Sequence, residues 1–236
     1  MVDIKNKVAV VTGAGRGIGR AIAIELGRAG ARVALAARGV AGLEETARLM
    51  GKDASVISTD VRKRDEVHRL LDQVSSTLGP VDILVNAAGV GVFGNVIDFS
   101  DQDYDTILDT NLRGIFLACR YVLPSMVSRG TGDIVNIASI AGKVGTAKRA
   151  VYCASKFGVI GFSQALGEEV RENGVRVSVV CPGSTDSSFS QDPNREGKTR
   201  SKMLSPSDIA HAVRTIVTQE PNSFISEIVL RPTKKP

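Results

Sequence analysis

The chain has 236 residues, of which 43% are hydrophobic and 23% are charged, and this composition excludes a disordered, collagen-like or coiled-coil protein. Its formal net charge is +5, but the basic residues are dispersed rather than gathered in a stripe, so we expect no nucleic-acid partner. A chain of this length is typical of one α/β domain with a sizeable core. We therefore expect residues 1–236 to form a single domain.

The sequence contains no predicted membrane or export segment. The first seven residues lack the long apolar stretch of a signal peptide, and the longest apolar runs are far too short to span a bilayer. The three cysteines, Cys119, Cys153 and Cys181, are odd in number and show no C-x-x-C spacing, so we expect neither a disulfide framework nor a metal site. These features predict a cytoplasmic protein that has no membrane partner.

Short β-branched runs alternate with amphipathic stretches along the whole chain. The expected strands are residues 8–12, 33–37, 55–58, 83–86, 134–138, 175–180 and 224–230. The expected helices are residues 17–29, 40–50, 63–78, 101–123, 150–172 and 206–219. Continuous apolar strands that alternate with helices predict a parallel sheet covered on both faces. Since crossovers between parallel strands are right-handed, the simplest α/β fold is a Rossmann-type doubly wound parallel sheet of about seven strands, flanked by helices in a three-layer α/β/α arrangement.

A glycine-rich turn follows the first expected strand, from Thr12 to Gly19, and a helix follows the turn. Its spacing is G-x-x-x-G-x-G, which differs from the G-x-G-x-x-G dinucleotide fingerprint because position 18 is Ile18. Glycines allow a tight turn and a close approach of the backbone, and the start of a helix offers free N–H groups to a phosphate. We interpret the turn, with Gly13 and Gly17, as a ligand-binding turn; the alternative is a purely structural connection.

The residues after the second expected strand indicate which dinucleotide would bind. An NAD site needs a carboxylate there, to accept a hydrogen bond from the ribose 2′-hydroxyl, but this strand ends in Ala36, Ala37 and Arg38. The 2′-phosphate of NADP favours a guanidinium, which Arg38 supplies, and Arg16 in the glycine-rich turn supplies a second. The alternative is that both are ordinary surface arginines. We expect NADP(H) as the cofactor.

Tyr152 and Lys156 are four residues apart at the start of an expected helix, so they share one face of it. Ser139 follows the strand expected at 134–138, and ligands of parallel sheets bind at such carboxyl ends. A phenol has a pKa of about 10, but a neighbouring ammonium stabilises the phenolate and lowers that pKa, which suits proton transfer. A serine can hydrogen-bond the carbonyl oxygen that becomes an alkoxide. The alternative is a surface pair in which the ring packs on the lysine stem.

The chain resembles the short-chain dehydrogenase/reductase family, and the resemblance extends to about residue 220. Many motifs, in order and at family-like spacings, carry it. They are the TGxxxGIG turn at 12–19, Asp60-Val61, Asn86-Ala87-Ala88-Gly89, Asn111, Ser139, Tyr152-x-x-x-Lys156 and Pro182-Gly183.

The resemblance implies roles in cofactor binding for these positions. Asp60 would bind the adenine, with Val61 beside it, and Asn86 and Gly89 would line the cofactor cleft. Residues after Pro182-Gly183 would contact the nicotinamide carboxamide and the phosphates. The expected cofactor contacts are Gly13, Arg16, Gly17, Ile18, Arg38, Asp60, Val61, Asn86, Ala87, Gly89, Tyr152, Lys156, Pro182, Gly183, Thr185 and Ser187.

The resemblance also implies roles in catalysis. Hydride would come from the nicotinamide and the proton from Tyr152. Lys156 would hold the nicotinamide ribose hydroxyls, and Asn111 would help to position a water in a proton relay with it. The expected catalytic residues are Asn111, Ser139, Tyr152 and Lys156, with no metal.

Two features bear on the substrate. Some similar proteins are 3-oxoacyl-carrier-protein reductases, which present arginines to their acidic carrier, but here the nearest arginine, Arg171, is displaced toward the end of the catalytic helix. The irregular segment 183–204, which folds over the substrate in this family, carries four basic side chains. They are Arg195, Lys198, Arg200 and Lys202. We expect the segment to favour an anionic substrate such as an acyl thioester; the alternative is a solvated, mobile loop.

These features together predict an NADPH-dependent reductase that converts a ketone or 3-oxoacyl group into a secondary alcohol. Two alternatives stay open, namely a dehydrogenase of a sugar, steroid or other secondary alcohol, and a non-catalytic NADP-binding regulator or scaffold. The intact set of catalytic residues argues against the regulator. By resemblance, the helices at 101–123 and 150–172 pair in a homodimer or homotetramer, although the chain end from Ile228 lacks the family's glycine-rich segment.

Overall fold

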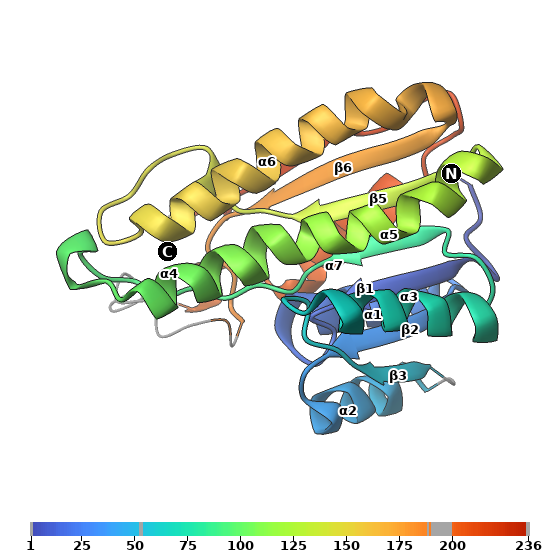
Figure 1. Ribbon diagram of the computed structural model, residues 1–236, viewed down its shortest axis with the longest axis horizontal. Coiled ribbons are helices and arrows are strands. Elements are labelled where there is room, and N and C mark those ends of the chain that lie inside the picture. The colour runs from blue at the N-terminus through green and yellow to red at the C-terminus, as the bar shows by residue number, and fades with distance from the viewer. Residues whose placement is uncertain (1, 52–53, 188, 190–199, 235–236) are drawn as a thin grey trace.

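Seven parallel strands form one sheet in a computed structural model that describes residues 2–51, 54–187, 189 and 200–234 (Figure 1). Their order across the sheet is β3-β2-β1-β4-β5-β6-β7, which confirms the doubly wound Rossmann-type arrangement. The strands are β1 (Val8–Thr12), β2 (Arg32–Ala37), β3 (Ser55–Ser58), β4 (Ile83–Asn86), β5 (Gly132–Ile137), β6 (Val175–Pro182) and β7 (Glu227–Leu230).

Helices cover both faces of the sheet, and the layers are therefore α/β/α (Figure 1). The helices are α1 (Gly17–Arg28), α2 (Val40–Met50), α3 (Arg64–Thr77), α4 (Asp101–Leu108), α5 (Gly114–Arg129), α6 (Ala150–Val170) and α7 (Pro206–Val217). Short helical turns are η1 (Val96–Asp98), η2 (Asp109–Arg113), η3 (Ile140–Gly142), η4 (Arg171–Asn173) and η6 (Arg200–Lys202). Among the described residues, no helix has both the length and the apolar character needed to cross a bilayer.

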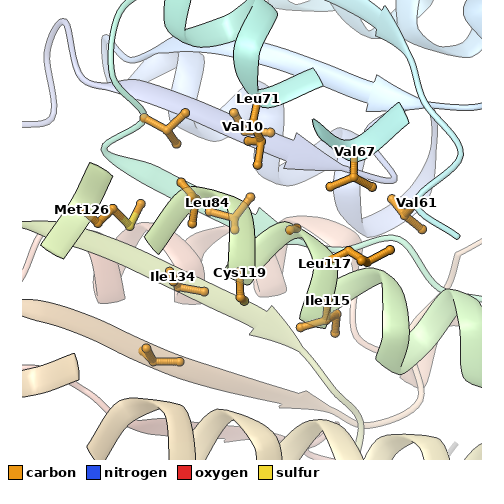
Figure 2. Close-up of a cluster of buried hydrophobic side chains, with 14 of the residues drawn as sticks. Val10, Val61, Val67, Leu71, Leu84, Ile115, Leu117, Cys119, Met126 and Ile134 are labelled. Atoms are coloured by element: carbon orange, nitrogen blue, oxygen red, sulfur yellow. The ribbon is translucent and has the colours of Figure 1, made fainter. Parts of the chain in front are cut away.

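The core has two halves because successive side chains of a strand point to opposite faces of the sheet. One half packs against α3, α5 and α6, and the other against α1, α2 and α7. Figure 2 shows the first half, in which strand residues Val10, Leu84 and Ile134 face side chains of α3 and α5. The helix residues labelled there are Val67, Leu71, Ile115, Leu117, Cys119 and Met126. Burial on both faces explains why these strands read as continuous apolar runs.

The helix expected at 101–123 is divided in the structure, and this expectation was wrong in detail. The chain forms α4, then the wide π-helical turn η2, and then α5, which continues to Arg129. Within η2, the Asn111 side chain bonds both backbone groups of Val90 in the loop after β4. This contact between distant parts of the chain lies outside what helical periodicity can predict. α5 ends at Gly130, whose φ of 66° is in the left-handed region that favours glycine.

Smaller differences occur at the ends of four strands, and those of β5 and β7 lie nearest the site or are the largest; β2 begins one residue earlier and β6 ends two residues later than expected. β5 spans Gly132–Ile137, so it ends one residue earlier than expected and Ser139 is the second residue after it. β7 begins at Glu227, three residues later than expected, because its ladder with β6 starts where Val179 pairs with Glu227. None of these differences moves a site residue away from the carboxyl edge of the sheet.

The carboxyl ends of β1 and β4 meet at the point where the strand order reverses, which is where doubly wound sheets bind ligands. The Thr12 hydroxyl at the end of β1 accepts hydrogen bonds from the N–H groups of Ala87 and Ala88, at 3.1 and 3.2 Å. Gly13 has a φ of 69°, and a Cβ there would lie 2.8 Å from the Ala87 carbonyl oxygen. Only glycine therefore permits this approach of the two turns.

A buried polar network joins β4 and β5 to α6, the helix that carries the Tyr-Lys pair. The Asn86 amide donates to Asn136 Oδ1 at 2.9 Å, and the Asn136 amide donates to Ser163 Oγ at 2.9 Å. Ser163 in turn donates to the Val159 carbonyl at 2.6 Å. All three polar side chains are buried, so each needs its partner.

We predict that Asn136→Leu lowers the free energy of unfolding by about 1–3 kcal/mol, because it removes the oxygen acceptor of the buried Asn86 amide and leaves only the weak Cys119 sulfur acceptor at 3.7 Å. Urea unfolding at equilibrium measures the change. The matched control is Asn222→Leu at an exposed position, which should stay within about 0.5 kcal/mol of the wild type. Equal effects of the two substitutions would contradict a stabilising role for the network.

Candidate active site

A cavity of about 750 Å³ lies at the carboxyl edge of the sheet. Its volume is in the range of small-molecule and cofactor sites. The wall consists of the glycine-rich turn, the segments after β2, β3, β4, β5 and β6, and the first turns of α6. Nearly all the residues expected to bind the cofactor line this cavity. They are Gly13, Arg16, Gly17, Ile18, Arg38, Asp60, Val61, Ala87, Gly89, Tyr152, Lys156, Pro182, Gly183, Thr185 and Ser187.

The glycine-rich turn leads directly into α1, which begins at Gly17 with Arg16 as its N-cap residue. The first turn of α1 contains no acidic side chain, so the positive end of the helix dipole is not neutralised from within. Ser187 lies across the turn, since a Cβ on Gly17 would be 3.5 Å from the Ser187 Cβ. This arrangement of backbone N–H groups suits a phosphate.

Cationic side chains gather where the segments after β2 and β3 meet the cavity. Arg38 directly follows β2 and is exposed, as is Arg16, and both line the cavity. Arg62, which the sequence analysis missed, holds the Asp60 carboxylate with two parallel bonds, Nε–Oδ1 at 3.0 Å and Nη2–Oδ2 at 2.6 Å. These bonds from Arg62, with a smaller effect of the Arg38 charge, keep the pKa of Asp60 below its usual range. Asp60 therefore stays ionised near neutral pH.

Tyr152 and Lys156 occupy the first turns of α6 and are both buried, 7% and 4% exposed. Lys156 Nζ lies 5.8 Å from the centre of the Tyr152 ring and donates to the Ile137 carbonyl at 2.9 Å, which ties α6 to the end of β5. Burial lowers the pKa of Lys156 to about 8. The side chain is therefore mostly an ammonium at pH 7, close enough to the phenol to stabilise a phenolate.

Ser139 reaches the same cavity from the other side, two residues beyond β5. Its Oγ accepts the N–H of Ala141 at 3.1 Å and lies 3.4 Å from the Pro182 carbonyl oxygen. A serine hydroxyl, a tyrosine hydroxyl and an ammonium thus come together from two elements. Such a group can orient a carbonyl oxygen and supply its proton.

Two expected site residues, Asn86 and Asn111, lie behind the wall of the cavity rather than in it. Asn86 is 2% exposed and belongs to the network with Asn136. Asn111 is fully buried, and its amide donates to the Val90 carbonyl at 2.9 Å and to Ser155 Oγ at 3.0 Å. One amide proton of Asn111 therefore holds the loop after β4, and the other ties η2 to Ser155 on α6.

The wall beside Tyr152 is aromatic, and the sequence analysis missed it. Phe93 lies edge-on to Tyr152 with ring centres 5.5 Å apart, and Phe189 is tilted against Tyr152 at 6.0 Å. Arg149 lies over the Phe93 ring, with its Cζ 5.3 Å from the ring centre. Arg149 is the N-cap residue before α6 and its φ is −130°, so helical spacing from Tyr152 does not predict the position of its side chain. The two phenylalanines carry no periodic signal.

The structure describes two of the four basic residues that were expected to bind the substrate. Arg195 and Lys198 lie outside the described residues, whereas Arg200 and Lys202 form the exposed turn η6, with Arg200 3.7 Å from Asp186. Arg171 is in η4 at the far end of the 21-residue helix α6, roughly 30 Å from its first turn. Arg171 is thus remote from the cavity.

Comparison with known sequences and structures agrees with this geometry. The family model of short chain dehydrogenases matches residues 7–198. An uncharacterized oxidoreductase of Staphylococcus aureus MRSA252 is 36% identical over 233 residues, which cover 98% of this chain and all of that protein. Another from Staphylococcus epidermidis RP62A is 35% identical over 234 residues, again covering 98% of this chain and all of the relative.

Two solved structures are also similar over nearly their whole length. A metagenomic short-chain oxidoreductase in complex with NADP is 38% identical with a TM-score of 0.86, and the match covers 99% of this chain and 100% of that one. An alcohol dehydrogenase from Thermococcus sibiricus, complexed with 5-hydroxy-NADP, is 30% identical with a TM-score of 0.88 and 98% coverage of both chains. With its sheet order, its cavity and its Ser, Tyr and Lys side chains in place, the chain belongs to the short-chain dehydrogenase family.

Proposed function

We propose that this protein is an NADP(H)-dependent oxidoreductase that reduces a ketone to a secondary alcohol. The observation that carries the proposal is the convergence of Ser139, Tyr152 and Lys156 on one cavity whose other end is the glycine-rich turn. A substrate carbonyl and a dinucleotide can therefore bind next to one another in this cavity. The similarity to two proteins complexed with NADP or its 5-hydroxy derivative supports the cofactor.

The described residues fit NADP(H) better than NAD(H). The backbone N–H groups at the start of α1 are placed to hold the pyrophosphate, and Arg16 and Arg38 are placed for the 2′-phosphate. No acidic residue follows β2 to accept the ribose 2′-hydroxyl that NAD would present. The one carboxylate among the described lining residues, Asp60, is held by Arg62 and would meet the adenine end.

The bound cofactor would supply a hydride to the carbonyl carbon of the substrate. Ser139 Oγ hydrogen-bonds the carbonyl oxygen and places it beside the Tyr152 hydroxyl, which donates the proton as the oxygen becomes an alkoxide. The Lys156 ammonium stabilises the resulting phenolate and binds ribose hydroxyls. Asn111 acts indirectly by holding Val90 and hence the loop after β4. The same groups catalyse alcohol oxidation in the reverse direction.

The site also bears on three alternatives, namely a non-catalytic scaffold, a 3-oxoacyl thioester as substrate, and alcohol oxidation. The shared cavity favours an enzyme over a non-catalytic regulator or scaffold, because a scaffold needs no buried ammonium beside a tyrosine. A 3-oxoacyl thioester is one member of the ketone class that the cavity could accept, but Arg171, the arginine considered for contact with a carrier protein, lies at the far end of α6 from the site. Oxidation of a sugar, steroid or other alcohol uses the same residues and is distinguished only by substrate.

We also propose assembly as a homodimer or homotetramer through the outer faces of α5 and α6. Phe116 on α5 and Phe157 on α6 are 41% and 47% exposed, and Phe116 packs edge-on against Phe162 with ring centres 6.4 Å apart. Exposed aromatic side chains on neighbouring helices are typical of protein interfaces. A second copy of the chain would bury them.

The first test is Tyr152→Phe, which removes only the hydroxyl. We expect kcat for ketone reduction to fall by about 10²–10⁴-fold while the Kd for NADPH changes less than twofold, because the phenol acts as the proton donor. Stopped-flow kinetics and fluorescence titration measure the two quantities. Tyr104→Phe, the same change at an exposed tyrosine, should have no effect. Retained turnover in Tyr152→Phe would exclude it as the donor.

The second test concerns the choice of cofactor. We expect Arg38→Asp to raise the Kd for NADPH by about 10–100-fold, because a charge-assisted hydrogen bond to the 2′-phosphate becomes a repulsion. The Kd for NADH should fall, because the new carboxylate can accept from the 2′-hydroxyl. Arg69→Asp, at an exposed position on α3, controls for net charge. A parallel loss for both cofactors would refute the role of Arg38.

The third test uses the burial of Lys156. At pH 7 we expect Lys156→Met to abolish turnover yet raise the free energy of unfolding by about 1–3 kcal/mol, because the folded wild type buries an ammonium. Between about pH 8, the folded pKa, and about 10.5, the unfolded chain binds more protons than the folded one, so wild-type stability rises with pH. The difference between the two proteins should therefore shrink over that range.

Denaturant unfolding at several pH values, with Lys5→Met at an exposed position as the control, measures this difference. A stability difference between wild type and Lys156→Met that is the same at pH 7 and pH 10 would show that Lys156 is not a buried ammonium.

A further inference from the structure

The aromatic wall beside Tyr152 is built around a glycine. A Cβ on Gly91 would lie 2.6 Å from Phe93 Cζ and 3.1 Å from Phe189 Cε1, so two rings occupy the space that a side chain would need. Both rings also contact Tyr152 and line the cavity. This end of the cavity therefore offers flat apolar surfaces on two sides of the tyrosine. Such surfaces suit an aromatic or other flat apolar group.

Arg149 places a guanidinium at the same wall. It is the N-cap residue of α6, it is half-buried, it lines the cavity, and its Cζ lies 5.3 Å from the centre of the Phe93 ring. Phe93 contacts both Arg149 and Tyr152, because its ring centre lies 5.5 Å from that of Tyr152 and 5.3 Å from Arg149 Cζ. A substrate whose carbonyl reaches Tyr152 therefore shares the cavity with the guanidinium of Arg149.

The backbone fixes the position of Arg149. Lys148 has a φ of 63°, a left-handed conformation that is costly for a residue other than glycine and persists where the surroundings enforce it. Here the carbonyl of Lys148 accepts a hydrogen bond from the Gly94 N–H at 2.9 Å, which joins the segment before α6 to the loop that carries Phe93. The backbone segments that carry Arg149 and Phe93 are therefore held next to one another.

The charged side chains that the structure describes at this end of the cavity are cationic. Among the described lining residues the only carboxylate is Asp60, which Arg62 holds at the opposite end, beside the segment after β3. Near Tyr152 the charged lining residues that the structure describes are Arg149 and Lys156, both cationic. A guanidinium presents parallel N–H groups that match a carboxylate in a bidentate manner.

We propose that Arg149 determines substrate specificity by binding a carboxylate of the substrate, while Phe93 and Phe189 pack against its flat apolar body. The substrate class is an aromatic ketone that carries a carboxylate. Tyr152 and Ser139 hydrogen-bond the carbonyl oxygen of the ketone. This inference rests on the proposed reductase function and adds the chemistry of the substrate.

The test compares two substrate pairs that differ only in charge. The pairs are 4-acetylbenzoate and 3-acetylbenzoate, each with its methyl ester, reduced with NADPH. We expect the wild type to prefer the acid over the ester of at least one pair by tenfold or more in kcat/KM. Arg149→Met should lower that acid-to-ester ratio by at least tenfold, and Arg149→Lys should restore part of it.

Lys148→Met is the matched control, since it removes one positive charge from the adjacent residue, whose exposed side chain does not line the cavity. It should leave the acid-to-ester ratio within about twofold, because an exposed charge is screened by solvent. Phe93→Leu should raise KM for acid and ester alike, because it alters the apolar surface and not the charge. Equal ratios in Arg149→Met and Lys148→Met, or a wild type without preference for either acid, would overturn the proposal.

A binding measurement separates this inference from the proposed function. Calorimetry measures the Kd of 4-acetylbenzoate and of 3-acetylbenzoate, each titrated into the protein with NADP⁺ present. For at least one of the two acids, the Kd should be at least tenfold lower with the wild type than with Arg149→Met. If neutral ketones are reduced through Tyr152 but this difference is absent, Arg149 is wrongly assigned and the reductase stands. If the acid binds through Arg149 but no ketone of either kind oxidises NADPH, the reductase function fails and the assignment of Arg149 stands.

Discussion

The close approach of β1 and β4 at their carboxyl ends is the constraint on which the rest of the site depends. The Thr12 hydroxyl holds the backbone of Ala87 and Ala88, and Gly13 leaves no side chain between the two turns. This contact aims the start of α1 and the loop after β4 into one cavity. Any larger residue at position 13 would push the phosphate turn away from the catalytic edge, so cofactor binding and chemistry share one steric requirement.

A second requirement concerns the burial of charge. The Lys156 ammonium is 4% exposed and binds the Ile137 carbonyl, and the described residues provide it with no carboxylate partner. Burial lowers the pKa of Lys156 to about 8, which indicates that the folded state is destabilised by this charge near neutral pH. The unpaired charge is then free to stabilise a phenolate on Tyr152. Stability and activity therefore place opposite demands on this one side chain.

The fold was predictable because strand burial leaves a direct signal, continuous apolar runs that end at glycine-rich or polar turns. The Tyr152–Lys156 pair was predictable because both residues lie on one helix, where spacing determines which face they share. Resemblance assigned Asn86 to the cofactor cleft and Asn111 to a proton relay with Lys156. Their partners, Asn136 and Val90, come from other elements, and no local pattern reveals such contacts. The same reason explains why the aromatic wall and the bond between Asp60 and Arg62 were missed.

Hydride transfer from NADPH to a carbonyl carbon, with the proton drawn from Tyr152, is the central claim, and a labelled cofactor tests it most directly. The measurement is the NMR spectrum of the alcohol formed from an aryl ketone and NADPH that carries deuterium at one face of the nicotinamide C4. With the two C4-labelled forms compared, we expect deuterium at the carbinol carbon from one form only. Tyr152→Phe should form this labelled alcohol at least about 100-fold more slowly. Consumption of NADPH without deuterium in the alcohol from either form would contradict the proposed reaction.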